Sequence, residues 1–273
     1  MSAALAPDGA AVNRLRESTA LLPLATWATL ISWPVWLRMG WSDMNVQTVT
    51  AQQRCTLSFE VHTAKAEADL IDACQLRAQA YGHHLGDAAA GFSQVDAVDR
   101  APGTVVLVCR DKASGQTLGT ARIQSSLVGA LPIERCIILP GRMSQQPRME
   151  VTRLAVRRGA DPLVKLCLMK AVYLYGDAHG INSLFICARS EALSRPYRRL
   201  GFKDCLAPGQ MLPLPYAGGI PHSVFTMNLS EVRDDWRRSG HRLYGFMFKT
   251  VHLDLPSFHR APHLPAVACR LQA

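Results

Sequence analysis

The feature that most constrains the fold is a repeated change of hydrophobic spacing between residues 55 and 229. Segments in which apolar and polar side chains alternate, as in half-buried strands, are separated by segments in which apolar residues recur every three or four positions, as in helices. The expected strands are 55–61, 104–110, 117–124, 148–157, 183–188, 210–215 and 223–229, and the expected helices are 64–81, 161–179 and 191–200. This order predicts an α/β or α+β fold in which helices cover the faces of one sheet.

Two places in this order carry local signals. Asp161 is a good helix N-cap, and Pro162 suits the first helical position because that position needs no N–H donor. The turn residues at 111–115 separate two strand-like runs. They therefore predict a β-hairpin.

The chain has 273 residues, of which 48% are hydrophobic and 19% charged, so it can fold as one domain with extensions. The expected parts are an apolar, Trp-rich extension at 1–54, a folded domain at 55–250 and a tail at 251–273. Within the extension, the segment 18–41 combines a long uncharged stretch with several tryptophans but is interrupted by prolines. It is expected either to contact a membrane peripherally or to pack on the domain as an arm.

Cysteine usage and charge limit the location and the partners. The eight cysteines form no C-x-x-C pair, which fits a reducing, cytoplasmic compartment. No cluster of ligands has metal-site spacing, so no metal is expected. The formal net charge of +9 suits an acidic protein or an anionic surface. Nucleic acid is not an expected partner, because the arginines are scattered and no nucleic-acid-binding motif is present.

The element order resembles the GNAT acyltransferase superfamily. So does the string at 197–202, in which Tyr197 is followed, after three intervening residues, by Gly201 and Phe202 at the end of a helix. Four further short strings, in order along the chain, resemble the autoinducer (acyl-homoserine-lactone) synthases and the related long-chain N-acyl amino acid synthases. They are Arg77 with Tyr81, Asp96 with Asp99, Gly119 to Arg122, and Glu150 with Thr152 and Arg153. The likeness covers residues 57–229.

The resemblance implies a GNAT-like fold with a central mixed, mainly antiparallel sheet flanked by helices. It also implies an enzyme that moves a long-chain acyl group from an acyl-carrier-protein thioester to the α-amine of an amino acid. Asp87 stands where autoinducer synthases carry tryptophan, and those enzymes lack the amino-terminal extension, so the amino acid synthases are the nearer likeness. The alternatives are an acetyl-CoA-dependent N-acetyltransferase, an autoinducer synthase and a non-catalytic acyl-binding module.

The string Glu150 to Arg153 is the expected catalytic centre. Glu150 is expected to act as the base, directly or through a water, and a backbone N–H near Thr152 to stabilise the oxyanion. Strict alternation would put Glu150 and Arg153 on opposite faces of the strand, so a shared site requires a β-bulge. We therefore expect a bulged, splayed central strand; without it, Arg153 would instead pair with Asp96 or Asp99.

The expected substrate-binding residues are Arg77, Tyr81, Asp96, Asp99 and Arg122. Two roles are open for the arginines. They bind the carboxylate of the amino acid through two parallel hydrogen bonds, or they form ion pairs with the aspartates that hold the helix and loop in place.

The donor site is expected at the start of the helix 161–179. GNAT enzymes hold the diphosphate of coenzyme A at this place, but here Asp161 and Pro162 make it poor for a diphosphate and adequate for one phosphate. This favours acyl-phosphopantetheine on an acidic carrier protein over acyl-CoA as donor substrate, with no tightly bound cofactor. The expected contact residues are Arg157, Arg158, Gly159, Tyr197, Arg198 and Arg199.

Overall fold

A computed structural model describes residues 54–259 of the chain. The predicted extension, its Trp-rich segment 18–41 and the last part of the predicted tail lie outside these described residues. Peripheral membrane contact through 18–41 therefore stays a prediction. Within the described part, no helix is both long and apolar enough to cross a bilayer.

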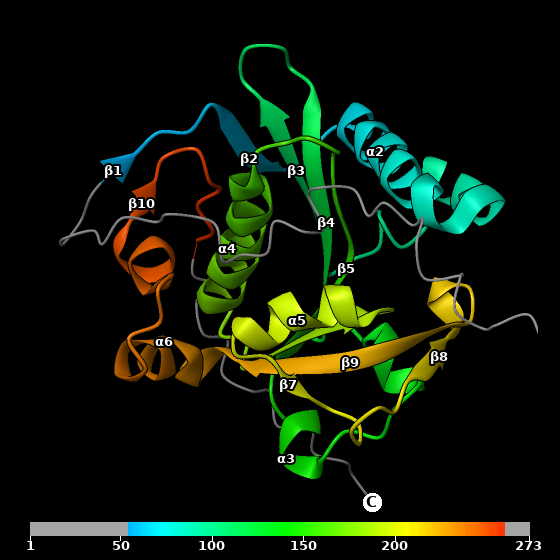
Figure 1. Ribbon diagram of the computed structural model, residues 1–273, viewed down its shortest axis with the longest axis vertical. Helices are drawn as coiled ribbons and strands as arrows, with labels where there is room; N and C mark the ends of the chain where they lie inside the picture. The colour runs from blue at the N-terminus through cyan, green and yellow to red at the C-terminus, as the bar shows by residue number, and fades with distance from the viewer. Residues whose placement is uncertain (1–53, 260–273) are drawn as a thin grey trace, which may run out of the picture. The chain divides into compact units, whose positions relative to one another are not determined.

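One eight-stranded sheet forms the centre of the domain (Figure 1). Its strands follow the order β2, β3, β4, β5, β6, β9, β7, and β8 pairs with β9 off this path. All neighbouring pairs are antiparallel except β5 with β6. The strands are β2 (Phe59–Thr63), β3 (Thr104–Asp111), β4 (Thr117–Ser125), β5 (Arg148–Val156), β6 (Ser183–Ala188), β7 (Lys203–Asp204), β8 (Leu212–Leu214) and β9 (Ile220–Asn228).

Helices cover both faces of this sheet. The helical elements are α2 (Glu67–Leu85), η2 (Gly86–Ser93), η3 (Pro132–Arg135), α3 (Gly141–Ser144), α4 (Pro162–Ala178), α5 (Glu191–Arg199), η4 (Pro215–Ala217), α6 (Leu229–Arg238) and η5 (Gly245–Lys249). Successive residues of β3 show the two faces: Leu107 belongs to the main core with α4, whereas Val106 and Val108 pack towards α2. The predicted GNAT-like sheet with flanking helices is confirmed.

The predicted elements fall close to the observed ones. The strand at 183–188 coincides with β6, and α4 begins where the N-cap signal places it, since the Asp161 carboxylate accepts the N–H of Leu163 at 2.8 Å. The predicted strand at 55–61 is divided into β1 (Arg54–Cys55) and β2. The break follows because the N–H of Leu57 donates to the Asp254 carboxylate at 2.6 Å and not to a strand.

Residues just beyond 250, assigned by sequence to the tail, continue the packing of the domain. β10 (Val251–His252) pairs in parallel with β1, and the two strands lie side by side in Figure 1. The buried Lys170 ammonium of α4 donates to the carbonyl oxygens of Phe246 and Thr250 at 2.5 and 2.6 Å and to His252 Nδ1 at 3.0 Å. Burial lowers the pKa of Lys170 to about 8. One α4 side chain thus fixes the carboxy-terminal segment.

Candidate active site

The central strand β5 is bulged and separates from its neighbour β6. Thr120 of β4 faces Ala155 while Arg122 faces Thr152, so two residues of β5 oppose one residue of β4. Arg153 lies at this bulge with a φ of 56°, in the left-handed region that side chains with a Cβ seldom adopt. The parallel pairing of β5 with β6 ends at Val151 although both strands continue. The predicted bulged, splayed strand is confirmed.

A cavity of about 230 Å³ lies at this separation and is lined by both strands and by η4. Most of its walls are apolar. The apolar side chains include Phe92, Val151, Ile186, Leu193, Leu214 and Ile220. The polar and charged side chains include Glu150, Thr152, Arg153, Lys165, Arg189 and Tyr216. The site is therefore a mainly apolar pocket with a few polar groups, the usual composition of a small-molecule site.

Glu150 is fully buried and belongs to the cavity wall. Its Oε2 accepts the backbone N–H of Ile133 at 2.9 Å, and its Oε1 accepts the hydroxyl of Tyr216 at 2.6 Å. Burial raises the pKa of Glu150 to about 7, although both hydrogen bonds favour the carboxylate. A carboxyl with this pKa can exchange protons at neutral pH, as a general base must.

Tyr216 reaches Glu150 from η4, a short turn 66 residues further along the chain. Burial, together with the nearby Glu150, raises the pKa of Tyr216 far above its ordinary value, so the hydroxyl keeps its proton. The Cys187 sulfur lies 3.9 Å from the same hydroxyl. Tyr216 therefore serves as a fixed donor to the carboxylate. Its position has no sequence signal, because a single tyrosine in a proline-flanked turn carries neither periodicity nor a motif.

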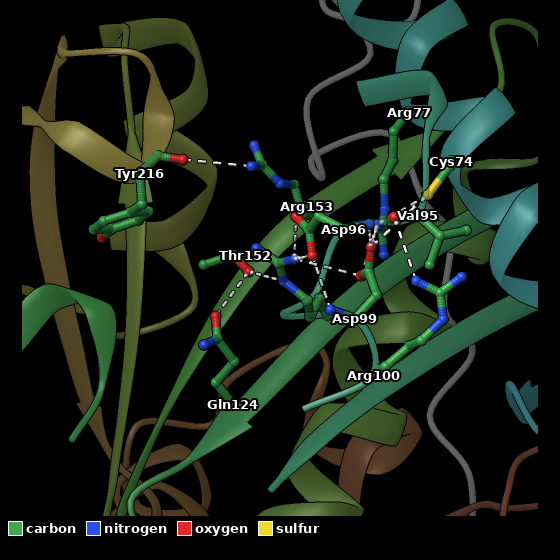
Figure 2. A network of polar contacts seen from close by, with 11 residues as sticks. Cys74, Arg77, Val95, Asp96, Asp99, Arg100, Gln124, Thr152, Arg153 and Tyr216 are labelled. Atoms are coloured by element: carbon green, nitrogen blue, oxygen red, sulfur yellow. Dashed lines mark hydrogen bonds and ion pairs between the residues drawn. The ribbon is translucent and has the colours of Figure 1, made fainter. Parts of the chain in front are cut away.

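The predicted substrate-binding arginines are held in ion pairs, of which that between Arg77 and Asp99 can be followed in Figure 2. Arg77 donates to Asp99 at 2.8 Å, and both side chains are almost completely buried. Arg122 donates to Asp96 at 2.9 Å and to Thr152 Oγ1 at 3.0 Å. Of the two roles open for Arg77 and Arg122, ion pairing with the aspartates is the one present, and neither guanidinium lines the cavity.

Tyr81 and Arg153 meet in the cavity wall. The Tyr81 hydroxyl donates to the carbonyl oxygen of Leu154, beside the bulge, at 3.3 Å, and burial raises the pKa of Tyr81. Its ring contacts Phe92 edge-on with centroids 5.1 Å apart, and the Arg153 guanidinium lies 4.3 Å from the centre of the Phe92 ring. Arg153 extends towards the backbone of Tyr216 and forms no ion pair with Asp96 or Asp99 (Figure 2).

The predicted phosphate-binding residues lie between β5 and α4, whose adjoining residues Val156 and Lys165 line the cavity. Arg157 uses its Nε to donate to the carbonyl oxygen of Thr117 at 2.9 Å. Arg158 is exposed, and Gly159 adopts a left-handed φ of 79°. Burial lowers the pKa of Lys165 to about 8. Basic side chains thus follow directly in sequence on a residue of the cavity wall, Val156.

The predicted contacts on α5 divide between the cavity and the surface. Tyr197 lines the cavity and is buried against Phe202. Arg198 is held at the exposed surface by Glu191 and Asp204, both at 2.9 Å, and Arg199 is exposed. The structure therefore brings Tyr197, but neither of the two arginines, to the pocket. Among the described residues, no group of three His, Cys, Asp or Glu side chains is placed to hold a metal ion.

No protein-family model matches the chain, and no curated protein matches it. Solved structures do match. The N-acyl amino acid synthase FeeM, from uncultured soil microbes, is 18% identical over 69% of this chain and 98% of FeeM, with a TM-score of 0.52. The CoA-dependent acyl-homoserine lactone synthase BjaI is 17% identical over 73% of this chain and 95% of BjaI, with a TM-score of 0.47. The AHL synthase LasI is 18% identical over 63% and 90%, with a TM-score of 0.45. The likeness to FeeM shows a shared fold.

Proposed function

We propose that this protein is an N-acyltransferase that moves an acyl group from a thioester to the α-amine of an amino acid, giving an N-acyl amino acid. The observation that carries the proposal is Glu150, a buried carboxyl with a pKa of about 7, in the wall of an apolar cavity where β5 leaves β6. The shared fold with FeeM, described as an N-acyl amino acid synthase, supports the same reaction class.

The reaction requires a base because an α-amine with a pKa of about 8 or more is mostly ammonium at neutral pH. Glu150, which is about half ionised at pH 7, takes the proton directly or through a water. The freed nitrogen attacks the thioester carbonyl carbon, a C–N bond forms and the carbonyl oxygen becomes an oxyanion. The C–S bond then breaks, and Glu150 gives the proton that it took from the ammonium to the departing thiolate. The carboxylate so regenerated accepts the remaining extra proton of the amide nitrogen and later releases it to solvent.

The bulge provides the means of stabilising the oxyanion. The pairing of β5 with β6 ends at Val151, and Thr152, Arg153 and Leu154 line the cavity beyond it, so we expect a backbone N–H near Thr152 to Leu154 to face the oxyanion. A preorganised backbone donor at a developing oxyanion contributes about 3 kcal/mol. The apolar walls would hold the acyl chain and exclude water.

The donor proposed is an acyl-phosphopantetheine on an acidic carrier protein. The Asp161 carboxylate already occupies an N–H at the start of α4, and Pro162 supplies none, so a diphosphate would lose the donors that it needs. Arg157 and Arg158 suit one phosphate, and the net charge of +9 favours encounter with an acidic carrier. This donor belongs to the cytoplasm, which is the proposed location.

The test is product analysis with both donors. The purified full-length chain is incubated with long-chain acyl-carrier protein, long-chain acyl-CoA or acetyl-CoA and a mixture of amino acids, and products are identified by mass spectrometry. We expect N-acyl amino acids from the carrier-bound donor and at least a 100-fold loss of rate in E150Q. Acetylated products from acetyl-CoA alone would establish the alternative acetyltransferase, and full activity of E150Q would remove Glu150 as the base.

A further inference from the structure

Arg153 is a cation in the cavity wall that has no anionic partner among the described residues. Its polar contact is with a neutral group, since Nη2 donates to the carbonyl oxygen of Tyr216 at 3.4 Å, and its guanidinium stacks over Phe92. Burial lowers the pKa of Arg153 and the nearby charges of Arg122 and Arg77 lower it further, whereas Tyr81 and the Asp96 carboxylate, which is not in ion-pair contact, act in the opposite direction. Those two arginines have carboxylates of their own.

This arrangement is costly to the folded protein. A partly buried charge without an ion-pair partner loses hydration that one long hydrogen bond and an aromatic ring replace only in part, and neighbouring like charges add repulsion. The left-handed φ of 56° at Arg153 adds backbone strain. A guanidinium held under these conditions in a pocket is a ready partner for an anion that enters with the substrate.

We propose that Arg153 binds the carboxylate of the acceptor, which makes the enzyme selective for α-amino acids over amines that lack a carboxylate. The inference rests on the function proposed above and replaces Arg77 and Arg122 as the carboxylate-binding residues. Glu150 and Arg153 lie three positions apart across the bulge and line the same cavity. An α-amino acid has its amine and carboxylate on one carbon, so one molecule can face the base and the guanidinium together.

The position of Arg153 favours a carboxylate over the phosphate of the donor. The reacting thioester must meet the amine beside Glu150, and the phosphate of phosphopantetheine is a whole pantetheine arm away from that thioester. Arg157 and Arg158 lie between β5 and α4 and are not among the residues that line the cavity beside Glu150. The anion nearest the base is therefore the one carried by the acceptor.

Arg189 supplies a matched control. It lines the same cavity from the residue that follows β6, and it too forms no ion pair with a described carboxylate. It is not on the strand of Glu150. If Arg153 is the carboxylate ligand, only substitutions at Arg153 will abolish discrimination between acids and neutral analogues.

The experiment compares the best amino acid acceptor with its carboxamide, which has the same size and an amine but no negative charge. We expect wild type to prefer the acid by about 100-fold in kcat/KM. R153Q and R153N should reduce this preference to a few-fold by raising the KM for the acid. R153K should retain part of the preference, and R189Q should retain all of it. R153N is included because asparagine tolerates a left-handed backbone, so it will fold if R153Q does not. Circular dichroism checks folding.

The outcomes separate the two claims. Equal use of the acid and the carboxamide by wild type, or loss of discrimination in R189Q but not in the Arg153 variants, overturns the inference and leaves the acyltransferase standing. Failure of wild type to acylate any amine from either donor overturns the proposed function, and the inference falls with it.

Discussion

The most informative single substitution is Y216F, which removes one hydroxyl and leaves the ring that packs in the cavity wall. Tyr216 donates to Glu150 at 2.6 Å, and this bond stabilises the carboxylate more than the neutral acid. Its removal must therefore raise the pKa of Glu150 from about 7. The backbone carbonyl of Tyr216, which accepts from Arg153, is unchanged by the substitution.

The size of the effect follows from the strength of the bond. A hydrogen bond to a charged group contributes about 1.5 to 3 kcal/mol, and one pKa unit corresponds to about 1.4 kcal/mol, so the pKa of Glu150 rises by about one to two units. At pH 7 the ionised fraction then falls from about one half to between roughly one tenth and one hundredth. Activity should fall by about 5- to 50-fold at pH 7 and recover towards pH 9 and above.

The assay is the pH profile of kcat/KM for acyl transfer, measured in wild type, Y216F and the control Y173F. Tyr173 lies on α4 and lines a different, apolar cavity together with Trp236 and Phe248, so loss of its hydroxyl should leave the acid limb of the profile in place. A purely structural role for Tyr216 would lower activity by the same factor at every pH. An unshifted acid limb in folded Y216F would refute the reasoning.

Three further predictions concern stability. The folded-state pKa of Glu150 is raised from 4.5 to about 7, so between these values the folded protein binds more protons than the unfolded chain and the stability of wild type falls as pH rises. E150Q does not titrate there. Its free energy of unfolding should therefore increase, relative to that of wild type, by on the order of 3 kcal/mol from pH 4.5 to pH 8, as measured by urea unfolding at each pH. D99N leaves the buried Arg77 without its counter-charge and should lower the free energy of unfolding by about 3 to 5 kcal/mol. D96N changes a side chain that is 43% exposed and should lower it clearly less in the same denaturation assay. R153N relieves a left-handed arginine and should match or exceed the wild-type melting temperature by calorimetry, and a large drop would show that the strain argument is wrong.

Local signals were sufficient to predict much of the fold. Asp161 and Pro162 mark the start of α4, and the hairpin between β3 and β4 follows from its turn residues. The bulge in β5 was predicted from a chemical requirement, because Glu150 and Arg153 can serve one cavity only if the alternation of the strand is broken. These features depend on residues close together in sequence, which is why the sequence contains them.

Local signals do not predict contacts between side chains that are far apart in the sequence. Tyr216 reaches Glu150 from 66 residues away, and nothing in its turn distinguishes it from a surface tyrosine. Arg198 was expected near the donor, but the carboxylates of Glu191 and Asp204 hold it at the surface. Whether Arg122 binds substrate or an aspartate depends on which anion lies within reach, and only the three-dimensional arrangement decides that.

The hydrogen bonds from Lys170 to residues 246–252 determine where this protein can be shortened. A chain cut after residue 250, the predicted end of the domain, would lose the His252 acceptor and also the Asp254 carboxylate that caps Leu57 and pairs with Lys112. The buried Lys170 ammonium would then lose one of its three hydrogen-bond acceptors, and β1 would lose its partner strand β10. Recombinant production of a minimal active fragment therefore has to retain the chain to about Phe258, whose ring closes against Tyr175.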